Sequence, residues 1–154
     1  MNRRNVLLLP IVGVTVASSQ AQAAELDPND YVCLRYCYLN GLRYTFAISK
    51  NTYQKLPTWT ALGDAPPPVS SGNAYSLAKT HLDTIKIPEN YGWDLERISL
   101  DPLGGIAPDG KWVWVVSFRY FIKGPSTGIW PRMNYIVTMD GKLVEPIVDK
   151  DKKS

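Results

Sequence analysis

Residues 111–122 constrain the fold of this chain more than any other stretch. Read with a period of two, they place large apolar side chains on one face of a strand and a mixed set on the other. The apolar face carries Trp112, Trp114, Val116, Phe118, Tyr120 and Ile122. A strand face made wholly of such groups must be buried, so the pattern predicts a sheet covered by a helix.

An amphipathic helix is predicted upstream of this strand, beginning after Ser70. Ser70 has the hydroxyl typical of an N-cap, and Val69 and Ala74 are placed as a hydrophobic staple. Beyond this start, one face of the helix carries apolar residues and the single histidine: Ala74, Leu77, Ala78, His81, Leu82 and Ile85. The small alanines allow the helix to lie close to a sheet.

Strand-like runs on both sides of the aromatic strand predict an antiparallel meander. Residues 93–101 alternate imperfectly, which indicates a bulge. Residues 133–139 place apolar side chains on one face, and the Asp140-Gly141 turn follows. Residues 142–145 are expected to finish the sheet.

A β-hairpin is predicted near the N-terminus by Asn40-Gly41, because both residues tolerate a positive φ. A two-residue loop sets the register: Leu39 opposite Leu42, Cys37 opposite Tyr44, Arg35 opposite Phe46 and Cys33 opposite Ile48. A helix is the alternative, because Asp27-Pro28 is typical of a helix start. The many tyrosines of this segment favour the strands.

The predicted order is therefore a β-hairpin, a proline-rich linker, a helix and a three-stranded meander. We expect an α+β fold in which one helix packs on an antiparallel sheet of about five strands. Residues 24–148 are long enough for one such domain. The charged residues 149–154 are expected to form a disordered tail.

Residues 1–23 have the pattern of a secretory signal peptide, with Arg3 and Arg4 ahead of an apolar run. Small residues at Ala21 and Ala23 predict cleavage after Ala23. The apolar run is shorter than the roughly 20 residues that span a bilayer, so we expect no stable membrane anchor after cleavage. We expect a periplasmic or secreted protein on the general secretory route, with twin-arginine export as the alternative.

Removal of the signal peptide leaves a nearly neutral chain. The whole sequence has 17 basic and 14 acidic residues, and the signal peptide accounts for two of the basic ones. Proteins that bind nucleic acid carry a basic patch, and no basic run is present here. The charge pattern therefore argues against a nucleic-acid partner.

The helix after Ser70, the aromatic strand and the closing sequence from Met139 to Val144 resemble small PepSY-like and cystatin-like domains. The resemblance covers about half of the chain and rests on pattern rather than on a diagnostic motif. It implies an inhibitory or protein-binding module, with another envelope or extracellular protein as its partner. The Gln-x-Val-x-Gly motif of true cystatins is absent from the sequence, so protease inhibition is one option within the binding class.

Aromatic side chains beside prolines are the candidate contacts for such a partner, because proline holds a loop aromatic in place. We assign binding to Trp59, Trp130, Ile129 and Arg132. The alternative is that the two tryptophans cover the ends of the sheet. We expect a non-enzymatic protein with no catalytic residue, no metal and no cofactor.

A metal-handling protein that uses Cys33, Cys37 and His81 is the alternative function, because soft thiolates suit Cu(I). Cys-x-x-x-Cys with a distant histidine resembles an exported copper-delivery family, but Tyr38 stands here where that family has proline. Within a strand the two cysteines are about 13 Å apart, beyond the Cα separation that a disulfide allows. Buried free thiols, a disulfide in a helical segment and a metal site all remain open.

A small hydrolase is the second alternative, because His81 could be combined with Ser99, Ser117 or Asp101. No nucleophile motif supports this combination. Asp94 and Glu96 share a strand face, where two exposed carboxylates are usually just solvated.

Overall fold

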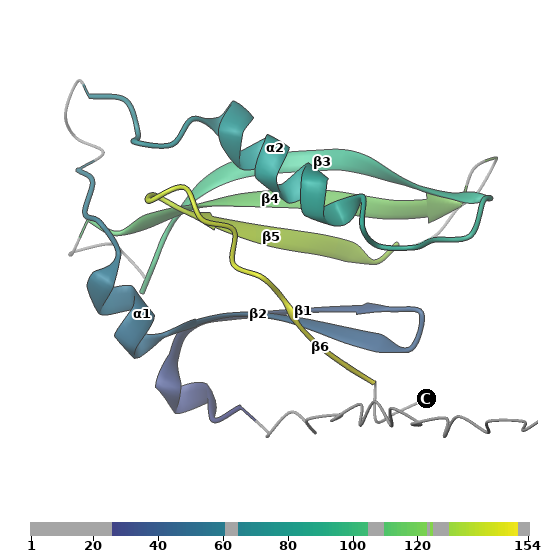
Figure 1. The fold of residues 1–154 in the computed structure, drawn as a ribbon, viewed down its shortest axis with the longest axis horizontal. Helices are drawn as coiled ribbons and strands as arrows, with labels where there is room; N and C mark the ends of the chain where they lie inside the picture. The colour runs from purple at the N-terminus through teal and green to yellow at the C-terminus, as the bar shows by residue number, and fades with distance from the viewer. Residues whose placement is uncertain (1–25, 61–64, 105–109, 123, 125–129, 151–154) are drawn as a thin grey trace, which may run out of the picture.

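The computed structural model describes residues 26–60, 65–104, 110–122, 124 and 130–150 of the chain (Figure 1). The predicted signal peptide lies outside these residues. The elements in chain order are η1 (Pro28–Asp30), β1 (Tyr31–Leu39), β2 (Leu42–Ser49), α1 (Lys50–Lys55), α2 (Ser71–Leu82), β3 (Tyr91–Pro102), β4 (Trp112–Ile122), β5 (Arg132–Thr138) and β6 (Ile147–Lys150).

The strands form two antiparallel sheets, and the prediction of one helix on one sheet of about five strands is wrong. The first sheet has the order β1-β2-β6 and the second has the order β3-β4-β5. In Figure 1, α2 lies above the second sheet, and the first sheet lies below the second. Within the described residues, α2 is the one long helix, so the fold is mostly β.

The segment after β5 turns back onto the last residues of that strand, so the first sheet cannot pair with β5 there. Leu143 forms a single bridge with Val137, and the Val144 amide donates to the Ile136 carbonyl at 2.9 Å. The chain then passes Pro146, which has no amide hydrogen, and pairs with β2 as β6. Residues 142–145 therefore form no strand of the second sheet.

The last described residues, Asp149 and Lys150, belong to β6. Arg43 of β2 donates to Asp149 at 3.0 Å and holds this strand in place. The remainder of the predicted tail, residues 151–154, lies outside the described residues.

The predicted hairpin and its register are confirmed. Leu39 pairs with Leu42 next to the turn, and Cys33 pairs with Ile48 at the far end. Asn40 has a φ of 52°, which an asparagine tolerates in this turn. Asp27 also caps a helical turn, but this turn is only the short η1, and the extended backbone of β1 follows it.

The predicted helix start is confirmed as well, because the Ser70 hydroxyl accepts a hydrogen bond from the Asn73 amide at 3.2 Å. Three residues of α2 are buried in the core: Ala74, Ala78 and Leu82. Leu77 is 37% exposed, and Ile85 lies beyond the helix end. No helix of the described residues is both long and apolar enough to cross a membrane.

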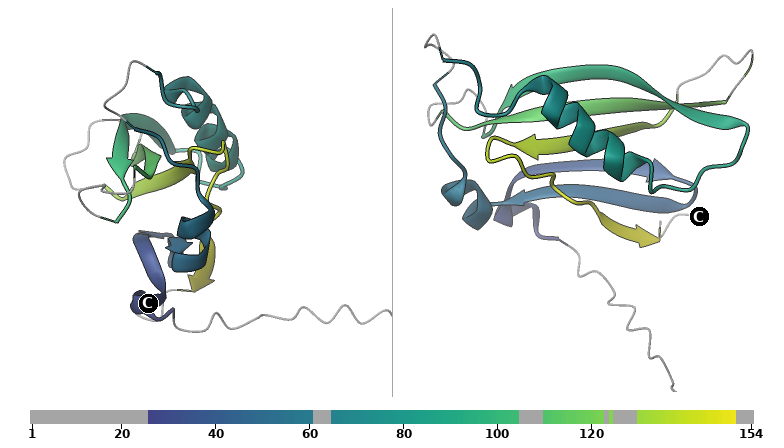
Figure 2. Two further views of the ribbon diagram at one scale, coloured as in Figure 1. Left: turned by 90° about the vertical axis from the view of Figure 1, so that its left-hand side faces the viewer. Right: turned by 45° about the horizontal axis from the view of Figure 1, so that its top comes forward.

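The hydrophobic core is made of side chains from α2 and from both sheets. Figure 2 shows the arrangement of these elements from two further sides. The Phe118 ring of β4 meets Tyr75 of α2, with 6.0 Å between the ring centroids. Tyr135 of β5 meets Phe46 of the first sheet at 5.2 Å. β4 is buried on both faces over its middle part, since Val115 and Val116 have no exposed surface.

Candidate functional site

Trp59 is fixed against the start of β4. Its backbone amide donates to the Gly110 carbonyl at 2.6 Å, and its ring meets Trp112 edge to face at 6.0 Å. The ring nitrogen donates to the Ala65 carbonyl at 3.3 Å. Trp59 therefore covers one end of the second sheet, as the alternative interpretation states.

The other predicted binding residues lie at the opposite end of this sheet. Arg132 begins β5 and pairs with Arg119, about 23 Å along β4 from Trp112 at the rise of a β-strand. Trp130 is half-buried two residues before Arg132. Ile129 lies outside the described residues. Trp59 and Arg132 thus cannot contribute to one small binding site.

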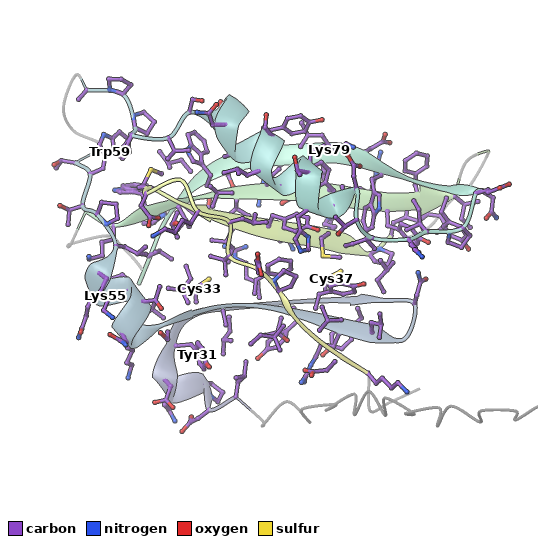
Figure 3. All side chains as sticks on the ribbon, in the orientation of Figure 1. Tyr31, Cys33, Cys37, Lys55, Trp59 and Lys79 are labelled. Atoms are coloured by element: carbon purple, nitrogen blue, oxygen red, sulfur yellow. The ribbon has the colours of Figure 1, made fainter. Side chains whose placement is uncertain are left out.

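The structure does not gather Cys33, Cys37 and His81 into one group of metal ligands. Cys33 and Cys37 follow one another along β1 as free thiols (Figure 3), while the His81 Nδ1 atom forms a hydrogen bond with the Tyr135 hydroxyl at 3.0 Å. Burial raises the pKa of Cys37 to about 11, so this thiol is protonated at neutral pH. The described residues include no group of three His, Cys, Asp or Glu side chains that could hold a metal ion.

The residues proposed for a hydrolase are separated by the second sheet. His81 contacts Tyr135, which pairs with Val116 and lies on the helix-facing side. Ser117 is the next residue of β4, so its side chain points to the opposite face. Its hydroxyl donates to Asn134 Oδ1 at 2.8 Å rather than to the histidine.

A bulge in β3 builds a charged region on this opposite face, near the end of the sheet that carries Arg132. Asp94 pairs with Arg119, and Arg97 pairs with Ser117. The register shifts between Leu95 and Arg97, so Glu96 is the extra residue of the bulge. The extra residue of a bulge redirects the neighbouring side chains. We call the set Asp94, Glu96, Arg97, Arg119 and Arg132 the arginine face, and all five residues are exposed.

Two members of the arginine face, Arg119 and Arg132, lie directly opposite each other. The Tyr120 amide donates to the Pro131 carbonyl at 3.0 Å, so the neighbouring arginine pair is of the non-hydrogen-bonded type. Cα atoms in such a pair are about 4.5 Å apart and the side chains are close together. Like charges in this position destabilise a sheet.

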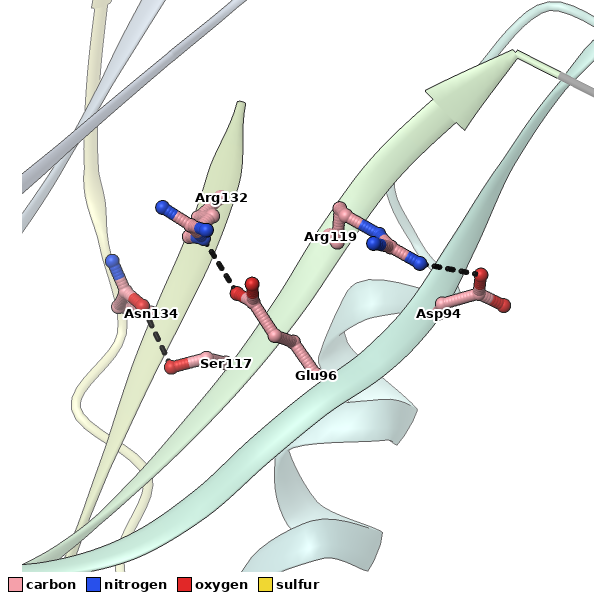
Figure 4. Close-up of polar contacts among 6 residues, drawn as sticks. All are labelled: Asp94, Glu96, Ser117, Arg119, Arg132 and Asn134. Atoms are coloured by element: carbon pink, nitrogen blue, oxygen red, sulfur yellow. Dashed lines mark hydrogen bonds and ion pairs between the residues drawn. The ribbon is translucent and has the colours of Figure 1, made fainter. Parts of the chain in front are cut away.

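Two carboxylates partly offset this repulsion (Figure 4). Arg132 Nε donates to Glu96 Oε2 at 2.6 Å, and Arg119 lies 3.5 Å from Asp94 Oδ2. The hydrogen bond from Arg132, together with the charges of Arg119 and Arg97, holds the pKa of Glu96 below its usual value. Three guanidinium groups face two carboxylates, so these five side chains carry one net positive charge.

An aromatic ring and an amide border the arginine face. The Phe121 ring lies against the backbone of Gly92, where an added Cβ would come within 2.8 Å of the ring. On the other side, Ser117 fixes the Asn134 side chain, which leaves the amide nitrogen of Asn134 as a donor. Arginine and aromatic side chains of this kind are enriched at protein interfaces.

Sequence reasoning selected Arg132, and Trp130 near it, but missed the other four residues of the arginine face. A bulge was expected within residues 93–101, but its position at residues 95–97 depends on the pairing with β4. An available signal was the sequence Asp94-Leu95-Glu96-Arg97, whose three charged residues cannot all face one side of a regular strand.

Comparisons with known proteins add no relative to this picture. A scan against protein-family models, a search of curated proteins and a search of solved structures each found no match.

Proposed function

We propose that this chain is an exported, non-enzymatic binding module. Its partner is another protein in the cell envelope or outside the cell, and the arginine face is the surface that binds it. Export follows from the signal-peptide pattern of residues 1–23, with a periplasmic or secreted product. Inhibition of the partner, which the resemblance to PepSY-like and cystatin-like domains implies, is one form of this function.

The observation that carries the proposal is the exposed pair of arginines directly opposite each other on β4 and β5. A sheet gains nothing in stability from two like charges at paired positions. An exposed guanidinium pair beside an aromatic ring does, however, offer a partner both charged and apolar contacts. This region of the sheet is therefore better suited to binding than to stabilising the fold.

The alternatives have less support. A metal carrier needs converging ligands, whereas His81 is hydrogen-bonded to Tyr135 and Cys37 is held as a neutral thiol by burial. A hydrolase needs a nucleophile beside a base, whereas Ser117 and His81 lie on opposite sides of the second sheet.

Photo-crosslinking from the edge of the arginine face tests the proposed function. With p-benzoylphenylalanine in place of Phe121, illumination of cells of the native host is expected to give one discrete adduct with an exported protein. The matched control carries the same group at Thr80, which is exposed on α2 on the other side of the sheet. Equal adducts from both positions, or none from position 121, would contradict the proposal.

A further inference from the structure

We propose that the arginine face is a carboxylate-binding site, and that Glu96 occupies it until an acidic segment of the partner takes its place. This inference rests on the proposed function and specifies the chemistry of the partner. The partner would insert an aspartate or glutamate side chain, or a C-terminal carboxylate, between the guanidinium groups.

Glu96 reaches across the sheet to its position. It belongs to β3, its neighbours in the chain pair with Phe118 and Ser117 of β4, and its carboxylate binds Arg132 of β5. The side chain therefore passes over the middle strand, and Figure 4 shows its carboxylate beside Arg132. The charges of Arg97 and Arg119 also act on this carboxylate and lower its pKa.

The site has unused donors that an incoming carboxylate can reach. A guanidinium group has five N–H donors, and Arg132 uses its Nε while Arg119 uses one terminal nitrogen. The side chains of Arg119 and Arg132 are 49% and 56% exposed, so a ligand can reach the others. Pairs of parallel N–H donors on arginine match the two oxygens of a carboxylate.

A carboxylate suits this site better than a phosphate does. Both anions accept paired hydrogen bonds from arginine. Asp94 lies 3.5 Å from Arg119, and Glu96 stays tethered nearby after displacement, so a doubly charged phosphate would meet two negative groups. The single charge of a carboxylate reduces this repulsion, and the site already holds a carboxylate.

Displacement of Glu96 costs little, because exposed ion pairs contribute little to stability. The internal carboxylate nevertheless competes with the ligand. It also forms a hydrogen bond with Arg132 and offsets the repulsion between Arg132 and Arg119 while the site is free of partner. Glu96 therefore lowers the affinity for the partner, but it keeps the two arginines together while no partner is bound.

Titration with an acidic peptide tests this inference through two changes of opposite sign. The probe is hexaglutamate with blocked ends, titrated into the mature protein at low salt and followed by the arginine Nε–Hε signals in NMR spectra. Glu96→Gln removes the competing carboxylate and is expected to tighten binding about fivefold. Arg119→Gln with Arg132→Gln is expected to weaken binding about tenfold or more.

The matched control is Lys50→Gln with Lys55→Gln, which changes the net charge equally on the exposed surface of α1, away from the arginine face. The inference predicts that this control binds hexaglutamate within about twofold of wild type at the same ionic strength. Weakening of the control as large as that of the arginine variant would overturn the inference, as would an unchanged affinity in Glu96→Gln. Tighter binding of inorganic phosphate than of hexaglutamate would overturn the choice of carboxylate.

The crosslinking and titration results separate this inference from the proposed function. An adduct from position 121 that persists in the Arg119→Gln/Arg132→Gln variant would leave the binding module standing and refute the carboxylate site. Peptide binding with the predicted changes, but without any adduct in cells, would support the site and contradict the protein partner.

Discussion

Replacing Phe46 with alanine is expected to lower the free energy of unfolding by about 3–5 kcal/mol, because a buried phenylalanine leaves a large cavity. Phe46 is 1% exposed, and its ring meets Tyr135 at an interplanar angle of 74°. This edge-to-face contact joins the two sheets, so its loss weakens the packing between them. Urea unfolding of the mature protein measures the change.

Tyr38→Ala is the matched control for Phe46→Ala. Tyr38 lies in the same hairpin but is 52% exposed, so we expect its loss to cost less than about 1 kcal/mol. Equal effects of the two substitutions would show that the hairpin does not pack on the second sheet through Phe46.

Replacing Lys111 with alanine is expected to cost about 2 kcal/mol, because hydrogen bonds from a charged donor are stronger than neutral ones. Lys111 is 9% exposed, and its ammonium donates to the Leu56 carbonyl at 2.6 Å and to the Gln54 carbonyl at 3.4 Å. These carbonyls lie at the C-terminal end of α1, where a cation is favourable. The substitution leaves both without this donor.

The exposed Lys142 provides the comparison for Lys111. Lys142 pairs with Asp140 but is 80% exposed, so Lys142→Ala is expected to change the free energy of unfolding by less than about 0.5 kcal/mol. Thermal or urea unfolding distinguishes the two variants. A Lys111→Ala protein as stable as Lys142→Ala would mean that the ammonium does not hold the end of α1.

Local signals predicted the local structure well. The Asn40-Gly41 turn determined the hairpin register, and the Ser70 hydroxyl determined the start of α2, because each depends on residues close in the sequence. The assignment of strands to sheets depends on distant contacts instead. β6 pairs with β2, which lies far from it in the sequence, and no local pattern indicates that.

The two faces of β4 show the same limit. Its apolar face was recognised, but Val113 and Val115 on the other face are also fully buried. Period-two alternation identifies one buried face and cannot show that a second layer covers the other. Likewise, the sequence alone does not distinguish Lys111 from an exposed lysine, because its hydrogen-bond partners are backbone carbonyls at the end of α1.

The candidate site was predicted only in part, because it combines residues from three strands. Trp130 was selected for its place beside proline, and Arg132 was named with it; both lie at the end of the second sheet that carries the arginine face. The partners of Arg132 come from β3 and β4, and they depend on a bulge whose position pairing alone determines. Trp59 was selected by the same rule and covers the other end.

Hydrogen exchange of the mature protein, alone and with the partner identified by crosslinking, tests most directly whether the arginine face is the binding surface. The account predicts slower exchange on binding in residues 91–97, 117–122 and 130–134, and unchanged exchange in residues 50–60 around Trp59. Slower exchange in residues 50–60, with no change in the three segments that carry the arginine face, would contradict it.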